Sequence, residues 1–163
     1  MAVALEPALR HNVWANRYLL DFCAKLDPSV VDRATPGTYG TIRTTLQHIV
    51  SGEQWYIGLL AGEYIGKPVD ENVPRPWSEL VDIATRTGER AIALARTDDP
   101  ARGITVDDKP WPASIVYIQF VHHGNEHRGQ VKSILGASGI EPPGVSAWGF
   151  GMDDANRSTA GDD

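Results

Sequence analysis

The sequence predicts an all-α protein, a four-helix bundle with long crossover loops and an irregular C-terminal tail. Four long segments repeat apolar residues every three or four positions, as one face of a helix does, and stretches rich in Gly and Pro separate them. The 163-residue length and 42% apolar content suit a single domain with its own core. We expect the bundle to span residues 1–150 and a flexible tail to span residues 151–163.

The first two helices are predicted at residues 7–26 and 41–60. In the first, Pro7 suits a first-turn position and Asp27-Pro28 ends the segment. Its apolar stripe is interrupted by one polar residue, Asn16. The second helix is apolar over a wide arc, which indicates that much of it is buried. A proline-rich passage from Gly66 to Trp77 then crosses the surface.

The third and fourth helices are predicted at residues 78–96 and from Pro112 or Ala113 onwards. Ser78 is a frequent N-cap residue, and Gly136 with Gly139 ends the last and longest helix. The stretch between them, residues 97–111, is predicted as a loop in which Ile104-Thr105-Val106 extends briefly as a strand.

The tail after Ile140 is rich in Gly, Pro, Ser and Asp. Trp148 and Phe150 are its large apolar residues, and we expect both to anchor part of it to the bundle. We expect residues 156–163 to be mobile.

Charge and composition exclude several classes of function. The formal net charge of −6 and the scattered basic residues argue against nucleic acid as a main partner, because binding phosphates needs clustered Lys and Arg. No run approaches about 18 apolar residues, so no membrane span is predicted. The first residues do not resemble a secretory signal, and we expect a cytoplasmic protein. The single cysteine, Cys23, is expected to be a small buried apolar residue.

Histidines occupy the inward face of the fourth helix. His123 and His127 continue the apolar stripe of Val116, Phe120 and Ile134, and residues four apart on a helix lie about 5–6 Å from each other. His48 lies in an apolar part of the second helix. A divalent ion held by three histidines keeps a coordination position for water or substrate. The alternative is a pair of hydrogen-bonded core histidines, or a pair at the rim of a pocket.

The histidine motifs resemble those of the DinB/YfiT-like family. The string from His123 to Gln130 is similar to that family's fourth-helix pattern, in which a histidine is followed four residues later by His-Arg-Gly-Gln. Trp14-Ala15-Asn16 resembles its Trp-Ala-Asn stretch, and Leu46-Gln47-His48-Ile49 resembles its Leu-x-His-Ile segment. The resemblance covers about residues 8–150.

The resemblance implies a four-helix bundle, often a homodimer, with a nickel or zinc site. Carried over residue by residue, it implies that His48, His123 and His127 are the ligands. The chain departs from the family at one place. Many members carry a histidine directly before the second ligand histidine, where this chain has Glu126, and this chain has an additional His122 before the first.

Three further residues are candidates for supporting roles. Gln130 shares the ligand face and either orients a ligand ring or a bound water, or is a helix-packing amide. Asn16 either hydrogen-bonds a ligand histidine or satisfies a buried backbone group. Trp55 lies on the stripe of His48 and either walls a substrate pocket or belongs to the core.

Other polar residues near the motif are interpreted without a role in the site. Arg128 points away from the ligand face and is expected at the surface or in an interface. Gly129 is expected to allow close contact between helices. Glu53 is a weak candidate for a general base, because its position matches the face of His48 imperfectly. His11 and His122 are expected to be exposed or at a rim.

The resemblance also implies chemistry. Characterised relatives include transferases and isomerases that use mycothiol or bacillithiol, so the leading hypothesis is a metal-dependent thiol S-transferase in detoxification or stress response. Its partners would be a small electrophile and the thiol. The excess of 11 arginines over 4 lysines suggests a GC-rich genome and favours mycothiol. The alternatives are a metal-dependent hydrolase and a metal-binding stress protein without turnover.

Overall fold

The computed structural model describes the backbone of residues 2–159 and the side chains of residues 5–154. In chain order the elements are α1 (Ala2–Cys23), α2 (Pro28–Val31), α3 (Ile42–Ala61), α4 (Trp77–Ala95), β1 (Gly103–Val106), β2 (Lys109–Pro112), α5 (Ala113–Ala137) and α6 (Ala147–Thr159). The predicted all-α class is confirmed, since the two short strands form the sheet of an otherwise helical structure.

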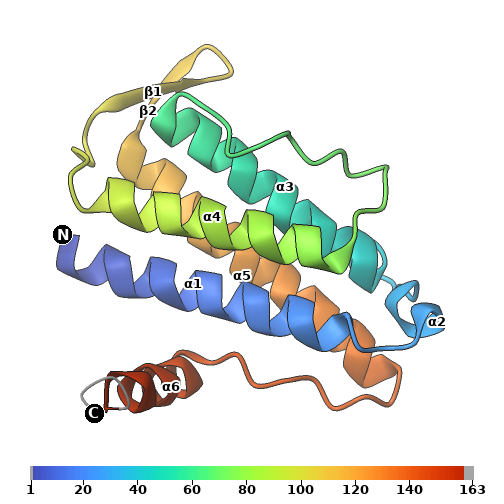
Figure 1. Cartoon of the computed structure of the whole chain (residues 1–163). Helices are drawn as coiled ribbons and strands as arrows, with labels where there is room; N and C mark the ends of the chain where they lie inside the picture. Colours follow the sequence, from blue (N-terminus) through green and yellow to red (C-terminus); the bar gives the residue numbers. More distant parts are fainter. Residues whose placement is uncertain (1, 160–163) are drawn as a thin grey trace.

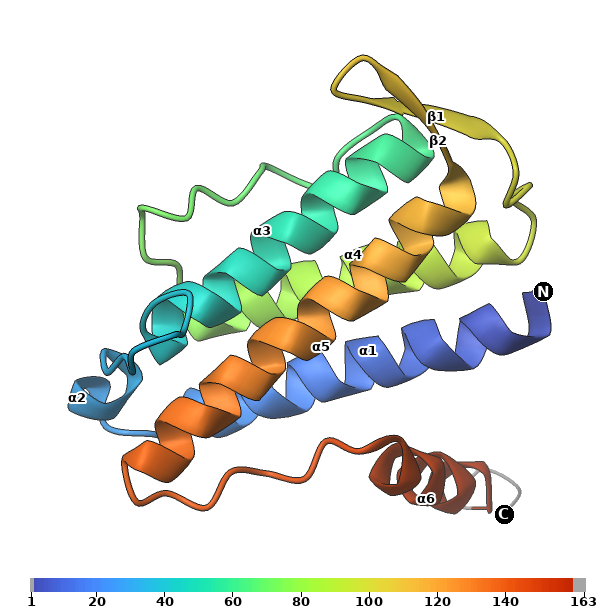
Figure 2. The same cartoon turned by 180° about the vertical axis from the view of Figure 1, so that it is seen from behind.

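The long helices α1, α3, α4 and α5 form the bundle (Figure 1). α1 packs against α4 and α5, and α3 packs against the same two helices from the other side. α3 and α4 run in the same direction, so the segment between them crosses the whole length of the bundle (Figure 2). This crossover, residues 62–76, runs along the outside of α3 and bears on the site described below.

Local signals set the ends of the elements. Thr41 caps α3 by accepting a hydrogen bond from the Thr44 amide at 3.1 Å, and Gly62 ends the helix in the left-handed conformation with φ 76°. β1 and β2 pair antiparallel through a tight turn in which Asp107 and Asp108 both have positive φ. Positive φ at both central residues is characteristic of a type I′ hairpin turn. The brief strand predicted at residues 104–106 is therefore part of a hairpin.

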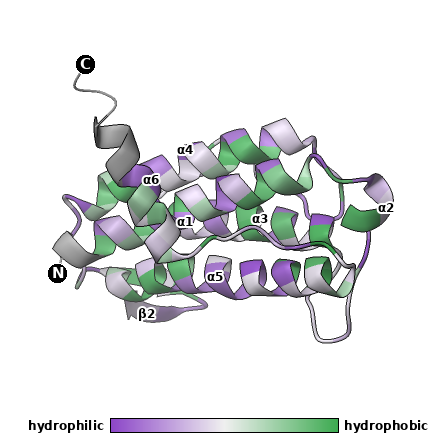
Figure 3. Cartoon of the chain, turned by 90° about the horizontal axis from the view of Figure 1, so that it is seen from below, coloured by the Kyte–Doolittle hydropathy of each residue, from purple (hydrophilic) through white to green (hydrophobic). Residues whose placement is uncertain are grey.

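The core consists of two apolar clusters with a polar layer between them. One cluster lies toward α2 and includes Leu46, Leu80 and Ile134, and the other lies toward the hairpin and includes Leu9, Ile57 and Phe120. Along α1, α3, α4 and α5 the positions between the clusters hold buried polar residues: Asn12, Asn16, Glu53, Thr87, His123, His127 and Arg128. Figure 3 shows hydrophilic residues interrupting the hydrophobic ones along α5. Buried polar groups need partners, so this layer is where chemistry or specific pairing is expected.

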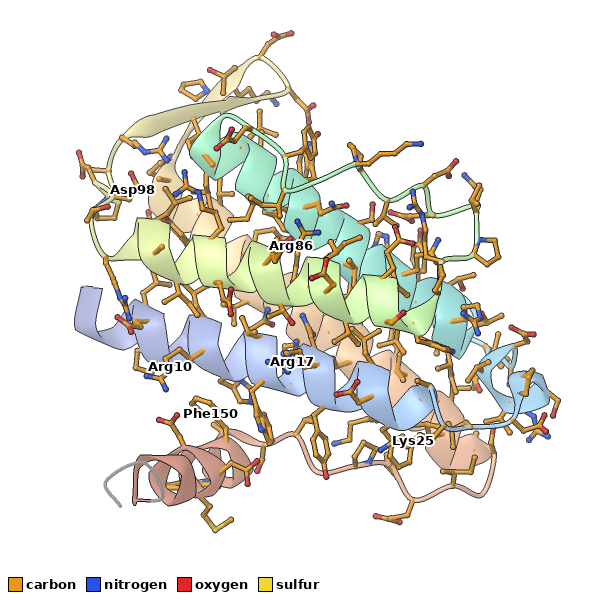
Figure 4. The ribbon with its side chains drawn as sticks, in the orientation of Figure 1. Arg10, Arg17, Lys25, Arg86, Asp98 and Phe150 are labelled. Carbon is orange, nitrogen blue, oxygen red and sulfur yellow. The ribbon has the colours of Figure 1, made fainter. Side chains whose placement is uncertain are left out.

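Part of the tail is helical. α6 lies alongside α1, and Phe150 projects from it toward α1 (Figure 4), where its ring lies 5.8 Å from that of Trp14. The expected anchoring by Trp148 is wrong, because this side chain is 88% exposed. Trp148 and Phe150 are two positions apart in α6, which begins at Ala147, and two positions correspond to about 200° around a helix, so only one of the two rings can face the bundle. Residues 156–163 were expected to be mobile. Of these, residues 156–159 belong to α6, and residues 160–163 lie outside the described residues.

The helix limits agree with the sequence expectation to within a turn, apart from α1, which begins at Ala2 where residue 7 was expected. The expected first-turn position of Pro7 is therefore wrong: Pro7 is the sixth residue of α1, where it removes the hydrogen bond that an amide would donate to the carbonyl four residues earlier. Within residues 2–159, none of the helices combines the length and the apolar character that crossing a lipid bilayer requires.

Candidate metal centre

Three histidines from two antiparallel helices meet in the polar layer. His48 comes from α3, and His123 with His127 comes from consecutive turns of α5. One ring nitrogen from each lies within 4.8 Å of the other two. The Nε2 atoms of His48 and His123 are 3.0 Å apart, and the three ring centroids are 4.5–4.7 Å from one another. The three residues predicted from the sequence are therefore brought together.

A glycine makes room for the cluster. Gly52 lies one turn after His48 on α3 and faces the ring of His123. A Cβ atom at this position would lie 2.7 Å from Cε1 of His123, closer than such atoms approach in proteins. The absence of a side chain at Gly52 therefore lets the His123 ring lie against α3, beside His48.

Two of the rings are oriented through their Nδ1 atoms. His48 Nδ1 lies 2.9 Å from Glu71 Oε2, and His127 Nδ1 lies 3.2 Å from Gln130 Oε1. When Nδ1 donates its hydrogen, Nε2 carries a lone pair and can bind a cation. Carboxylates and amides commonly hold ligand histidines in this way. Gln130 thus lies where one of its two sequence interpretations placed it.

Tyr39 covers the cluster from the loop before α3. Its ring stacks on His48 at a centroid distance of 3.9 Å and meets His127 edge-on. Its hydroxyl donates to Glu71 Oε2 at 2.6 Å, and its backbone amide donates to Gln130 Oε1 at 2.8 Å. One residue thereby links the two groups that orient the rings. Sequence reasoning missed Tyr39 and Glu71, since both lie in loops without a periodic pattern.

The electrostatics favour neutral rings and an ionised carboxylate. Burial lowers the pKa of His123 to about 4, and the charges of His127 and His48 act in the same direction. Burial also lowers the pKa of His127. For Glu71, burial opposes ionisation, but hydrogen bonds from Tyr39 and His48 outweigh it and lower the pKa. At neutral pH His123 and His127 are neutral, which is the state that metal binding requires.

The donor set fits a divalent transition metal. Two nitrogens that bind one ion at about 2.1 Å and subtend about 90–110° are about 3.0–3.4 Å apart, which agrees with the distance between His48 and His123. His123 Nδ1 is buried without a hydrogen-bond partner among the described residues, so the role of this ring is not explained by hydrogen bonding alone. Imidazole ligands suit zinc, nickel, copper and iron.

A cavity opens beside the cluster. Its volume is about 410 Å³, within the range of small-molecule sites, and both His48 and His123 line it. The remaining wall comes from α3 and from the crossover that follows it, and includes Trp55, Tyr64 and Glu71. Trp55 is 43% exposed and lines the cavity, so it is not part of the core.

Comparison with known proteins identifies the family. The model of the DinB family matches residues 1–153. The chain belongs to the DinB family. A solved structure, a DinB-like protein from Bacillus cereus, is similar with 20% sequence identity and a TM-score of 0.67, over 83% of this chain and 91% of that one. At this identity the likeness shows the fold. The comparison with curated proteins found no significant match.

A second buried polar cluster in this DinB-family protein lies next to the histidines, and we call it the asparagine network. Asn12 and Asn16 of α1 both donate to Glu53 Oε1 at 2.6 Å, and their carbonyl oxygens accept from Arg128 Nη1 at 2.7 and 2.6 Å. Among the described residues, Asn16 therefore hydrogen-bonds neither a ligand histidine nor a backbone group.

The expectation about Arg128 in this network is wrong. Arg128 is only 2% exposed, so it is not a surface residue, because α5 contacts α1 as well as α3 and buries a wider arc than one stripe. Glu53 is fully buried beside α1, and its carboxylate contacts the asparagines. Burial raises its pKa to about 7, against the hydrogen bond from Asn12 and the charge of Arg128.

The remaining expectations concern single residues. Gly129 is exposed with open space around it, so the close approaches are made by Gly52, Gly88 and Gly124 instead. Cys23 is fully buried as expected, and burial raises the pKa of its thiol to about 12. His122 is exposed, whereas His11 is half-buried and lies 2.9 Å from the carbonyl of Val145.

Proposed function

We propose that this protein is a metal-dependent enzyme that transfers a low-molecular-weight thiol to a small electrophile. One observation carries the proposal. Three imidazoles converge on one point at the edge of a cavity large enough for a small molecule. A zinc or nickel ion held there would supply a Lewis acid that favours the thiolate form of a coordinating thiol at neutral pH.

The protein's own residues hold this site in place. Glu71 and Gln130 orient His48 and His127, and Tyr39 joins the two orienting groups while covering the rings. A fixed orientation matters because misplacing a reacting group by about 1 Å costs orders of magnitude in rate. Tyr39 also shields one side of the cluster, so a substrate approaches from the cavity beside His48 and His123.

The proton chemistry of the cavity favours a thiol over water. Enzymes that activate water at a metal commonly add a carboxylate as general base, as in the His-Glu-x-x-His proteases. Among the residues lining the cavity, the carboxylate is Glu71, whose Oε2 already accepts from Tyr39 and His48. A thiol would not need such a base, because coordination to a divalent ion by itself favours the thiolate.

The proposed reaction balances without an oxidant or a reductant. The thiol sulfur gives up its proton to solvent and forms a bond to the electrophilic carbon, and the bond from that carbon to its leaving group breaks. Resemblance to the thiol-dependent members of the family suggests mycothiol or bacillithiol as the natural donor.

Metal analysis tests the site. The protein is purified without an affinity tag or chelator, next to His123→Ala and the control His122→Ala, whose side chain is exposed. We expect near-stoichiometric zinc or nickel in the parent and in His122→Ala, and marked loss in His123→Ala. A parent without metal would refute the proposal.

A substrate panel tests the reaction. Metal-loaded protein is assayed with an alkyl or aryl halide in the presence and absence of a small thiol, and separately with esters and amides. We expect turnover that requires both metal and thiol. Ester or amide cleavage without thiol would instead identify a hydrolase, and no turnover with tight metal binding would identify a metal-binding protein.

A further inference from the structure

The cavity beside the histidines contains no positive side chain. Its lining comprises polar and aromatic residues of α3 and of the crossover, and no Lys or Arg is among those described there. The acidic side chain among the described residues of the wall is Glu71. The protein as a whole is also acidic, with a formal net charge of −6. Apart from the ion proposed at the histidines, a negatively charged ligand group would therefore lose water in the cavity without meeting a cation.

Two polar side chains of the wall, Gln54 and Ser51, are already engaged. Gln54 donates to the carbonyl groups of Ile65 and Lys67 and accepts from the amide of Val69, and Ser51 donates to the Val69 carbonyl. These bonds hold the crossover against α3, which Figure 2 shows running side by side. Because these donors are used to fix the wall, they are not available to bind an anion in place of a cationic side chain.

Aromatic surface makes up much of the rest of the wall. Trp55, Tyr56 and Tyr64 line the cavity, and Trp55 and Tyr64 are 43% and 48% exposed. Aromatic faces pack against apolar and uncharged groups, and they attract cations more readily than anions because the ring face carries negative charge. The wall therefore disfavours an anion for a second, independent reason.

We infer that the cavity selects thiols whose body carries no negative charge. This inference rests on the proposed function, because it describes the thiol that the metal centre accepts. A neutral thiol, including one with hydroxyl or amide groups, fits this cavity, and a thiol that carries carboxylates away from its sulfur is disfavoured.

A matched pair of rigid thiols tests the inference by binding alone. 4-Mercaptobenzamide and 4-mercaptobenzoate have the same shape, and the para position keeps the carboxylate from reaching the ion that the sulfur contacts. Both are titrated into the cobalt-loaded protein at pH 7.5, where the absorption spectrum of cobalt reports the binding of sulfur. Affinities are corrected for the measured pKa of each thiol. We expect the amide to bind at least about tenfold more tightly than the carboxylate.

The possible outcomes separate this inference from the proposed function. Equal affinity, or tighter binding of the carboxylate, overturns the charge selection while leaving the thiol site intact. If neither thiol changes the cobalt spectrum, the proposed thiol chemistry fails and the inference fails with it.

A charge introduced into the wall gives a second readout. Tyr64→Lys places an ammonium group in the wall, and Tyr18→Lys makes the same change on α1, where Tyr18 is 47% exposed and lies outside this cavity. We expect Tyr64→Lys to improve binding of 4-mercaptobenzoate by about tenfold with little effect on the amide, because of the new Coulomb attraction. Tyr18→Lys should change neither affinity. An equal effect of both variants would show that general charge, and not the cavity, decides binding.

Discussion

The histidine cluster and the asparagine network are neighbouring polar clusters in one layer of the bundle, but they are built differently. The network joins three helices, because asparagines from α1 bridge Glu53 of α3 and Arg128 of α5. The histidine cluster joins two helices, and loops complete it through Tyr39 and Glu71. The network is enclosed, whereas the histidines border a cavity.

This difference separates structural from chemical roles. The side chains of the network satisfy one another, apart from Glu53 Oε2 and Arg128 Nη2, which have no hydrogen-bond partner among the described residues. The histidine nitrogens instead lie close to one another beside an open space. We therefore expect changes in the network to alter folding with or without metal, and changes in the cluster to alter metal binding in a protein that still folds.

The largest expected effect follows from removing the cation of the network. Arg128→Met leaves the carbonyl oxygens of Asn12 and Asn16 without a buried donor, and leaves the carboxyl of Glu53 without a nearby cation. The free energy of unfolding should fall by about 3–5 kcal/mol, by similar amounts with and without metal. Urea denaturation of both forms measures it.

Arg86→Met is the matched control for this prediction. Arg86 forms an exposed ion pair with Asp82 on α4, so its replacement should change stability by no more than about 0.5 kcal/mol. Similar losses for the two variants would mean that the network contributes no more than a surface pair.

The pH dependence of stability tests the second network residue. Burial raises the pKa of Glu53 from 4.5 to about 7, so the folded state holds this proton more tightly than the unfolded state. The resulting stabilisation is complete below about pH 4.5 and is lost as the pH rises through about 7. It amounts to about 3 kcal/mol.

Glu53→Gln removes this titration and keeps an oxygen that accepts from both asparagines. Between pH 5 and pH 8 the parent should lose about 2–3 kcal/mol of unfolding free energy relative to the variant. The exposed Glu126→Gln is the control and should follow the parent. Parallel pH profiles for parent and Glu53→Gln would rule out a raised pKa at Glu53.

The smallest effect, confined to metal binding, is expected at the glycine that faces His123. Gly52→Ala places a methyl group against the ring, so the ring must shift away from His48. We expect metal affinity to fall by about tenfold or more, measured by competition with a chromogenic chelator. The far-UV circular dichroism spectrum should stay helical.

Gly129→Ala is the paired control, since a Cβ atom there meets nothing within 4 Å. It should leave the affinity unchanged and stabilise the protein by about 0.5–1 kcal/mol, because alanine favours a helix more than glycine does. Unchanged affinity in Gly52→Ala would show that the ring position does not depend on this close contact.

Comparison of the two clusters also explains which site residues could be predicted. His123 and His127 continue an apolar stripe at the helical repeat, so periodicity alone places them inward. Arg128 is the next residue after His127, rotated by about 100°. Periodicity alone assigns it to the outside, but α5 has a second neighbour, α1, on that side.

The hydrophobic repeat of the sequence predicts neither the contacts made by loop residues nor the helical structure of α6. Tyr39 and Glu71 are 32 positions apart, and their contact depends on how two loops fold over α3. α6 contains glycines and aspartates that do not favour a helix by themselves, and it packs on α1 through Phe150 and Trp14. Tertiary contacts therefore decide whether such a segment is helical.

The amino-acid sequence by itself determined the four long helices, their inward faces and the three histidines, because burial of apolar side chains acts through short-range periodicity along one helix. Only the tertiary structure decided what surrounds those histidines: the network behind them, the two loops that help to orient their rings, and a cavity wall with no Lys or Arg among its described residues. These features depend on pairs of residues far apart in the chain, which come into contact when three helices and a crossover pack together.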